Sequence, residues 1–153
     1  MVNEKSILMR PLDRERQGLL DLISRLGSNL IVAEIGSYLG ESAKLFLDSG
    51  KVKCLYCIDP WINDYDRSDE ASYRCPMSDI ERLFDERMKP YSNVEKVKAT
   101  SKEAVNRFRD AFFDLVYVDG MHTYEAVKQD LTLYCPKIRK GGYLAGHDWG
   151  WKG

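Results

Sequence analysis

Apolar residues follow two patterns that alternate along the chain, a helical spacing and short, nearly continuous runs. Leu19, Ile23 and Leu26 follow the i, i+4, i+7 spacing of a helix, and Gly27 ends it. The run at 30–35 is almost entirely apolar, which is typical of a strand buried on both faces. The same reasoning along the rest of the chain predicts helices at 13–26, 41–48, 78–88, 101–108 and 124–134, and strands at 30–35, 52–59, 94–98, 113–118 and 143–147.

Two helix starts carry polar signals. Ser78 is followed three residues later by Glu81, a spacing typical of a capping box. Ser101 is predicted to cap the short helix that runs through Phe108. The alternation of strand and helix predicts an α/β fold, a Rossmann-like, doubly wound and mostly parallel sheet with helices on both faces. Ligands bind to such sheets at the carboxyl ends of the strands, so we look there for chemistry.

Composition narrows the functional classes. The chain has 153 residues, with 23 Lys and Arg against 24 Asp and Glu, so a nucleic-acid partner is not expected. It has neither an apolar run long enough to span a bilayer nor a secretory signal, which predicts a cytoplasmic protein with no membrane partner. Cys54 and Cys57 lie three apart on a predicted strand and so point to opposite faces, which favours ordinary buried thiols.

The first predicted strand ends in a glycine turn, Gly36 to Gly40, that leads into a helix. Tyr38 stands where a nicotinamide-dinucleotide fingerprint needs glycine, which argues against a nicotinamide-dependent oxidoreductase. Asp59 ends the second strand, about 20 residues further on, where a carboxylate can accept both hydroxyls of a ribose. Together these features predict a nucleoside-containing ligand, and a plain strand–helix turn with a solvated Asp is the alternative.

Further polar side chains follow the fourth and fifth strands. Asp119, His147 and Asp148 should meet there, because these strands are neighbours of the first in a doubly wound sheet. Carboxylates and an imidazole suit a divalent ion, although His147 could instead hydrogen-bond a carboxylate or a substrate. Several aromatic residues flank the same edge and could either form a lid over a ring-bearing substrate or pack within their own segment: Trp61, Tyr65, Tyr73, Trp149 and Trp151.

Four motifs then resemble those of a known family. The segments at 34–42, 58–61, 117–124 and 141–148 are similar, in order and spacing, to class I S-adenosylmethionine (SAM)-dependent methyltransferases. The similarity extends over residues 30–149 and is greatest to the branch with DG-x-H-x-Y and GG…HD signatures, which is related to macrocin and catechol O-methyltransferases and to cephalosporin-hydroxylase-like proteins.

The resemblance implies roles for the cofactor site. Glu34 would lie near the amino group of the methionine portion of SAM, and Gly36 would place its backbone against that portion. Asp59 would bind the ribose and Ser101 the adenine. The remaining implied cofactor contacts are Ser37, Tyr38, Gly40, Pro60, Trp61 and Asp119.

The resemblance also implies roles in catalysis. Asp119 and Asp148 match metal-ligating positions for Mg²⁺ or another divalent cation, and His147 could join them. His122 stands where related enzymes place a lysine base, and an imidazole can take up a proton near neutral pH. We therefore expect His122 and Asp119 to be catalytic. Met121 departs from the family, many of whose members carry a carboxylate there.

These observations predict one methyltransferase-like domain over residues 1–153, with an N-terminal helix in 1–28, a cofactor-binding core at 30–149 and a lid loop at 60–77. The expected reaction is O-methylation of a small hydroxylated substrate, such as a sugar or natural product, with or without a divalent metal. The alternative is a shortened, non-catalytic module that binds SAM or a nucleotide. The sequence stops after the fifth predicted strand, so the last strands of the family's fold are expected to be missing. A free edge there predicts a homo-oligomer.

Overall fold

The computed structural model describes residues 14–67 and 69–147, in which helices and strands alternate. The strands are β1 (Leu30–Ile35), β2 (Val52–Asp59), β3 (Val94–Lys98), β4 (Phe113–Val118) and β5 (Ile138–Gly146). The α-helices are α2 (Arg14–Arg25), α3 (Glu41–Asp48), α4 (Met77–Met88), α5 (Ser101–Ala104) and α6 (Tyr124–Tyr134). Three short 3₁₀ helices complete the chain, η1 (Glu70–Ser72), η2 (Val105–Arg107) and η3 (Cys135–Lys137).

All strand pairs are parallel, and the strand order is β3-β2-β1-β4-β5. The chain therefore runs outward from β1 to β3 and then crosses back to β4 on the other side of β1. The carboxyl ends of β1 and β4 lie side by side at this reversal, which is where doubly wound sheets bind ligands. The predicted α/β fold is confirmed.

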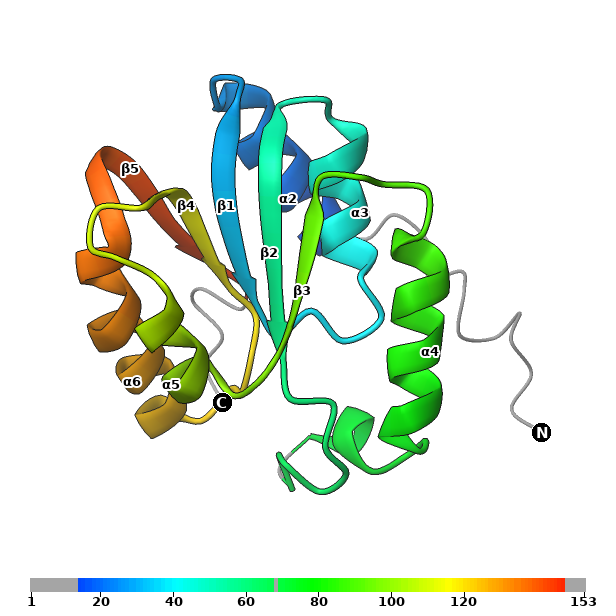
Figure 1. Cartoon of the computed structure of the whole chain (residues 1–153). Coiled ribbons are helices and arrows are strands. Elements are labelled where there is room, and N and C mark those ends of the chain that lie inside the picture. Colours follow the sequence, from blue (N-terminus) through cyan, green and yellow to red (C-terminus); the bar gives the residue numbers. More distant parts are fainter. Residues whose placement is uncertain (1–13, 68, 148–153) are drawn as a thin grey trace.

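Helices cover both faces of the sheet (Figure 1). On one face, α2, α3 and α4 pack on a core that includes Ile23, Phe46 and Phe84. On the other face, α5 and α6 pack on a second core that includes Phe113 and Tyr134. Since β1 and β4 are covered on both sides, their apolar runs are buried throughout almost their whole length.

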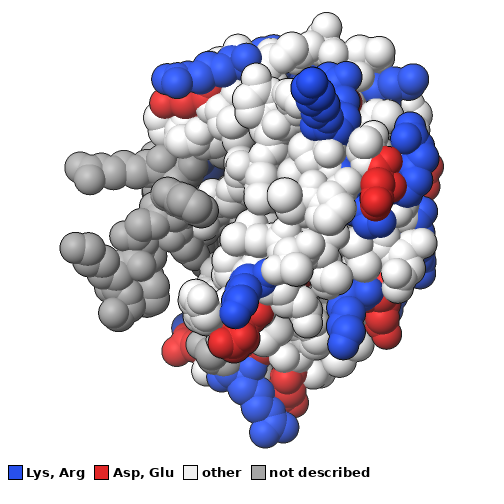
Figure 2. All heavy atoms as spheres, turned by 90° about the vertical axis from the view of Figure 1, so that its left-hand side faces the viewer, with Lys and Arg blue, Asp and Glu red and all other residues white. Residues whose placement is uncertain are grey.

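Strand β5 lies at the edge of the described sheet and pairs with β4. Tyr143 and Leu144 on this strand are 52% and 41% exposed. Figure 2 shows that the middle of this side of the molecule carries few charged side chains, with lysines, arginines and acids around its margin. Within the described residues, no helix is both long and apolar enough to cross a membrane.

Two predicted helix caps are wrong. Helix α5 is capped by Thr100, whose hydroxyl accepts from the backbone N–H of Glu103 while the Glu103 carboxylate accepts from the backbone N–H of Thr100. Helix α4 begins one residue before Ser78, and the side chain of Asn63 accepts from the N–H of Met77 at 2.7 Å. In both cases another polar side chain reaches the free N–H groups of the first turn.

Strand β5 begins at Ile138, earlier than the predicted 143. The pairing register shifts between Phe113 and Leu115, which face Ile138 and Tyr143 respectively. Gly141 adopts a φ of +80° within the extra residues, a conformation that glycine tolerates best. All four cysteines are free thiols, and of the two that were predicted to be buried, Cys57 is buried and Cys54 is partly exposed.

Candidate functional site

A cavity of about 630 Å³ opens at the carboxyl ends of the strands. Its wall brings together residues that are far apart in the sequence. The predicted site residues that line it are Gly36, Tyr38, Asp59, Pro60, Ser101, Asp119, His122 and His147. Asp148, Trp149 and Trp151 lie outside the described residues.

The glycine turn after β1 is fixed against β2 and β4. The N–H of Gly36 donates to the carbonyl of Ile58 at 2.8 Å, and the N–H of Asp119 donates to the carbonyl of Ile35 at 2.8 Å. Gly36 has a φ of +86°, and a Cβ placed on it would lie 2.1 Å from the carbonyl oxygen of Asp119. No side chain fits here, so the backbone of β1 and that of β4 approach each other directly.

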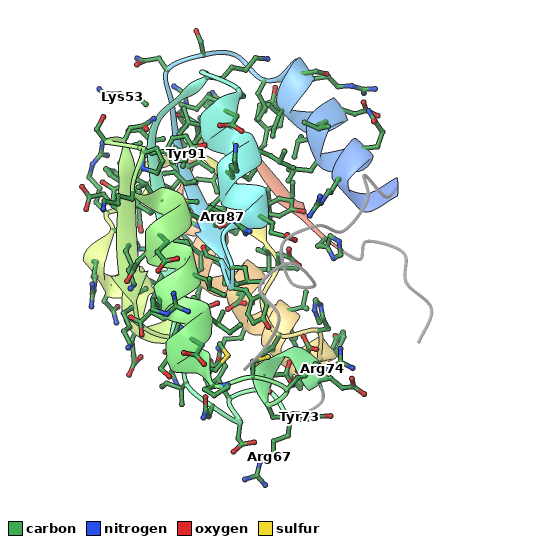
Figure 3. All side chains as sticks on the ribbon, turned by 90° about the vertical axis from the view of Figure 1, so that its right-hand side faces the viewer. Lys53, Arg67, Tyr73, Arg74, Arg87 and Tyr91 are labelled. Carbon is green, nitrogen blue, oxygen red and sulfur yellow. The ribbon has the colours of Figure 1, made fainter. Side chains whose placement is uncertain are left out.

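The far end of the turn is held by packing. Gly40 has a φ of +74° and caps α3, and a Cβ on it would lie 2.9 Å from the ring of Phe84. Arg87 reaches from α4 and donates to the carbonyl of Leu39 at 2.6 Å (Figure 3). Gly40 is absent from the cavity wall, so the structure gives it a role in seating the turn on α4 rather than the predicted cofactor contact.

Glu34 also differs from its predicted role. Its side chain is fully buried and does not line the cavity. The hydroxyl of Ser37 donates to Oε2 at 2.6 Å, and that of Ser42 donates to Oε1 at 2.5 Å. Burial raises the pKa of Glu34 to about 7, against the lowering effect of the two hydroxyls. Glu34 therefore ties the turn to the start of α3 from beneath, and Ser37, itself 2% exposed, is part of this support.

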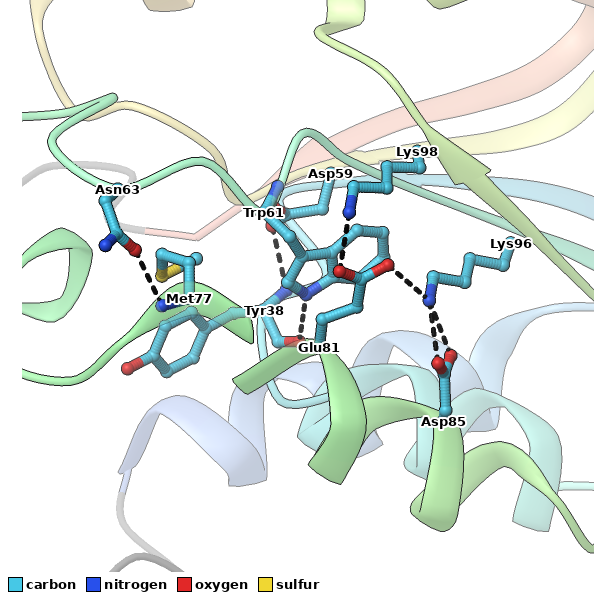
Figure 4. Close-up of polar contacts among 9 residues, drawn as sticks. All are labelled: Tyr38, Asp59, Trp61, Asn63, Met77, Glu81, Asp85, Lys96 and Lys98. Atoms are coloured by element: carbon cyan, nitrogen blue, oxygen red, sulfur yellow. Dashed lines mark hydrogen bonds and ion pairs between the residues drawn. The ribbon is translucent and has the colours of Figure 1, made fainter. Parts of the chain in front are cut away.

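Asp59 organises two neighbouring loops (Figure 4). Its Oδ2 accepts from the N–H of Tyr38 at 3.0 Å, and its Oδ1 accepts from the N–H of Trp61 at 2.8 Å. Both donor residues have positive φ, 44° for Tyr38 and 46° for Trp61. The carboxylate is 7% exposed, and burial raises its pKa. Each oxygen keeps a second lone pair, so Asp59 can hold the loops and also accept from a ligand hydroxyl.

Trp61 supports the loop and does not cover the cavity. Its indole N–H donates to the carbonyl of Tyr38 at 3.0 Å (Figure 4), and the residue is 4% exposed. Its ring packs 4.9 Å from that of Phe84, with the ammonium of Lys96 5.0 Å from its centroid. The contacts of Trp61 therefore hold the loop in place, and its predicted cofactor contact stays a prediction.

The loop between β2 and α4, the predicted lid, lies at the mouth of the cavity. Tyr65 is 40% exposed and lines the cavity, whereas Tyr73 is 52% exposed and does not. Figure 3 shows Tyr73 and Arg67 on the outer side of this loop, whereas Arg74 lines the cavity. The hydroxyl of Ser72 donates to the carbonyl of Asp66 inside the loop. Of the predicted aromatic lid, the described part of the chain places Tyr65 at the cavity.

Asp119 and His147 meet at the ends of β4 and β5. Nδ1 of His147 lies 3.4 Å from Oδ1 of Asp119, and each side chain is 25% exposed. His122 is exposed and lines the same cavity. Among residues 14–67 and 69–147, no group of three His, Cys, Asp or Glu side chains is arranged to hold a metal ion. The described residues thus supply two of the three predicted metal ligands.

Residues 33–149 match a family model described as a methyltransferase domain. The chain belongs to this methyltransferase family. SAM is the cofactor of that family.

The chain is 30% identical over 128 residues to protein R132, an uncharacterized protein of Acanthamoeba polyphaga mimivirus. The match covers 79% of this chain and 52% of that protein, so the chain spans about half the length of the curated relative it matches.

Solved structures share the fold of this chain. An rRNA methylase from Streptococcus thermophilus has a TM-score of 0.64 at 12% identity, covering 90% of this chain and 72% of that one. SMU.1697c from Streptococcus mutans, solved in complex with S-adenosylhomocysteine (SAH), has a TM-score of 0.63 at 13% identity, covering 89% and 73%. At these identities the similarity establishes the Rossmann-like fold alone.

One residue that lines the cavity was missed in the sequence analysis. Asp130 on α6 is 4% exposed and lines the cavity, where its Oδ1 accepts from the hydroxyl of Ser101 at 2.5 Å. A signal was available, because Asp130 is an acid within the apolar stripe formed by Val127, Leu131 and Tyr134. An ionisable residue on the buried side of a helix is rare without a partner.

Proposed function

We propose that the chain binds SAM in the cavity at the strand ends and transfers its methyl group to a hydroxyl of a small molecule. The observation that carries the proposal is the position of Asp59. This acid ends β2 beside the Gly36 turn, lines the cavity and keeps lone pairs for a ligand diol. SAM would supply an activated sulfonium methyl group, so the protein contributes mainly binding and orientation.

Residues from three strand ends and α5 line the cavity and support this assignment. In the proposal, the methionine portion lies against the backbone of Gly36, which lines the cavity at the sheet reversal. Asp59 would bind the ribose, and Ser101 at the start of α5 would contact the base. Glu34, Gly40 and Trp61 act indirectly by fixing the turn and the loop that present these groups.

Asp119, His122 and His147 are grouped at the ends of β4 and β5, where an acceptor hydroxyl would approach. In the proposed step, the oxygen of the acceptor forms a bond to the methyl carbon as the carbon–sulfur bond breaks, and the electron pair stays on sulfur. His122 accepts the hydroxyl proton. Asp119 orients His147 at 3.4 Å, and His147 is placed to position the acceptor.

Whether a divalent metal ion assists the methyl transfer can be tested separately. The described residues offer Asp119 and His147, whereas the third predicted ligand, Asp148, lies outside them. We derive no step through a metal. Methyl transfer measured with added Mg²⁺ and with a chelator tests the point directly, and equal rates would exclude a required divalent cation.

The test of the proposal has two stages. Calorimetric titration with SAH measures cofactor binding, and Asp59→Ala should weaken it. Glu125→Gln is the control, because this exposed acid on α6 does not line the cavity. Transfer of a labelled methyl group from SAM to sugars, phenols and other hydroxylated compounds then measures turnover. Binding without turnover on any acceptor would favour the non-catalytic module, and no binding would refute the proposal.

A further inference from the structure

Glu34 is buried in the core beneath the cavity, and the two serines that donate hydrogen bonds to it belong to the cavity surface. The hydroxyl of Ser37 donates to Oε2 at 2.6 Å, and that of Ser42 donates to Oε1 at 2.5 Å. Ser42 lines the main cavity, and both serines line a recess of about 110 Å³ that shares Gly36 with it. A change at the carboxyl group can therefore reach a ligand in the cavity through one hydrogen bond.

The groups around Glu34 disfavour a charge on it. Cys57 and Tyr117 stand beside it on β2 and β4, and the thiol of Cys57 makes a hydrogen bond with it. The helices on this side add apolar side chains. Burial is the largest of the effects that raise the pKa of Glu34 to about 7, the two serine hydroxyls oppose it, and the negative charges of Asp119 and Asp59 add to it. Both protonation states are therefore populated near neutral pH.

The two protonation states need different hydrogen bonds. An ionised carboxylate only accepts, so both serine protons point toward it, as observed. A protonated carboxyl also donates, so one of the two bonds reverses and the serine oxygen accepts. Ser37 is 2% exposed, whereas Ser42 lines the main cavity. The bond to Ser42 is the one that can reverse, because its hydroxyl proton then has the cavity to turn into.

We propose that Glu34 is a proton-sensitive positioning residue: when it takes up a proton, Ser42 turns its hydroxyl proton into the cavity, and a ligand there is bound more tightly. When Glu34 is ionised, it holds the hydroxyl of Ser42, and the ligand loses that donor. The proposal rests on the proposed function, because the ligand occupies the same cavity. Ligand binding and proton uptake are then linked, and each strengthens the other.

The first test is calorimetric titration of the wild-type protein with SAH at several pH values. A hydrogen bond changes affinity by roughly 3-fold to 10-fold. With half-protonation of free Glu34 near pH 7, SAH should bind roughly 2-fold to 5-fold more tightly at pH 6 than at pH 8. Titrations in buffers of different ionisation enthalpy should also show that binding takes up about 0.3–0.5 of a proton between pH 7 and 8.

The second test uses variants that separate this coupling from a merely structural role. Glu34→Gln carries an NH₂ donor and an oxygen acceptor at every pH, as the protonated carboxyl does. It should therefore bind SAH at pH 8 roughly 2-fold to 5-fold more tightly than wild type and lose its share of the pH dependence. The histidines of the cavity are present in both proteins, so the difference between them belongs to Glu34.

Two substitutions at Ser42 and one on α6 complete the comparison. Ser42→Ala removes the hydroxyl that turns and should flatten the pH dependence as Glu34→Gln does. Ser42→Thr keeps a hydroxyl and should restore it. Glu125→Gln removes an exposed acid that does not line the cavity and should behave as wild type.

Each outcome decides the proposal. SAH binding with equal affinity at pH 6 and pH 8 in the wild-type protein overturns it and leaves the proposed function standing. No binding of SAH at any pH overturns both. Weaker binding by Glu34→Gln than by wild type at pH 8, or an unchanged pH dependence in that variant, also overturns it. If Glu34→Gln does not fold, the contrast between Ser42→Ala and Ser42→Thr decides, and equal pH dependence in these two refutes the coupling.

Discussion

Replacing Gly36 by alanine adds a single methyl group where β1 and β4 end side by side. A Cβ on Gly36 would lie 2.1 Å from the carbonyl oxygen of Asp119, 2.5 Å from its carbonyl carbon and 2.6 Å from Cα of Gly120. All three atoms belong to the backbone, so no side-chain rotation relieves the contact. The strand ends would have to separate, although the N–H of Asp119 is bonded to the carbonyl of Ile35 at 2.8 Å.

The expected loss of stability has two parts. An L-residue at a φ of +86° pays about 1–2 kcal/mol for the left-handed backbone. Overpacking against fixed atoms adds about 1–3 kcal/mol. Gly50→Ala isolates the first part, because Gly50 has a φ of +67° and a Cβ there meets nothing within 4 Å. We expect Gly36→Ala to lose about 2–5 kcal/mol, a large share of the 5–15 kcal/mol that is usual for a domain.

Urea denaturation followed by tryptophan fluorescence measures both variants under the same conditions. The midpoint should fall further for Gly36→Ala than for Gly50→Ala, by the equivalent of about 1–3 kcal/mol. SAH affinity should also fall in Gly36→Ala and stay unchanged in Gly50→Ala. Equal midpoints for the two variants would refute the reasoning, because they would show that the turn relaxes away from β4 at no cost.

Three further predictions concern acids and the sheet edge. Burial raises the pKa of Glu34 to about 7, above its usual 4.5, so the folded state binds the extra proton. The stability that this proton gives to the folded state is complete below pH 4.5 and is lost as the pH rises through 7. The urea midpoint of the wild-type protein should therefore fall over that range, and the midpoint of Glu34→Gln should fall less. Asp59→Asn should lower SAH affinity by about 10-fold to 100-fold in calorimetry, because the amide NH₂ cannot accept from a ribose hydroxyl. We also propose that copies associate through β5, so Tyr143→Lys should shift sedimentation toward monomer, and a wild-type monomer would contradict this.

Hydrophobic periodicity predicted most of the fold because the helices and strands place their apolar residues in the two cores. The bounds of β1, β2, β3 and β4 agree with the sequence prediction. Each is a run of apolar or alternating residues, and β1, β2 and β4 are followed by a glycine, a proline and an acid respectively. The start of β5 could not be predicted in this way. Its first residues are Ile138, Arg139 and Lys140, and strand pairing there depends on the bulge at Gly141 rather than on a buried apolar pattern.

The sequence predicted the location of the candidate site better than it predicted the role of each residue. The topology alone brings Asp59, Asp119 and His147 to one edge, because the carboxyl ends of parallel strands meet there. The roles of Glu34 and Trp61 depend on which way each side chain turns. Glu34 turns away from the cavity toward Ser37 and Ser42, and Trp61 turns inward onto Phe84. Neither orientation follows from spacing along the chain.

Three buried carboxylates near the cavity differ in the hydrogen bonds that their oxygens already accept. Both oxygens of Glu34 accept from serine hydroxyls and Glu34 itself does not line the cavity, so we expect its loss to affect stability and loop position most. Asp59 holds one backbone N–H on each oxygen and faces the cavity, so its loss should disturb both the loops and binding. Asp130 lines the cavity and accepts from the hydroxyl of Ser101, so its loss should disturb the contact between α6 and the start of α5. Removing one acid at a time should therefore separate effects on stability from effects on ligand affinity, and a common effect from all three variants would mean that the acids act through their shared negative charge alone.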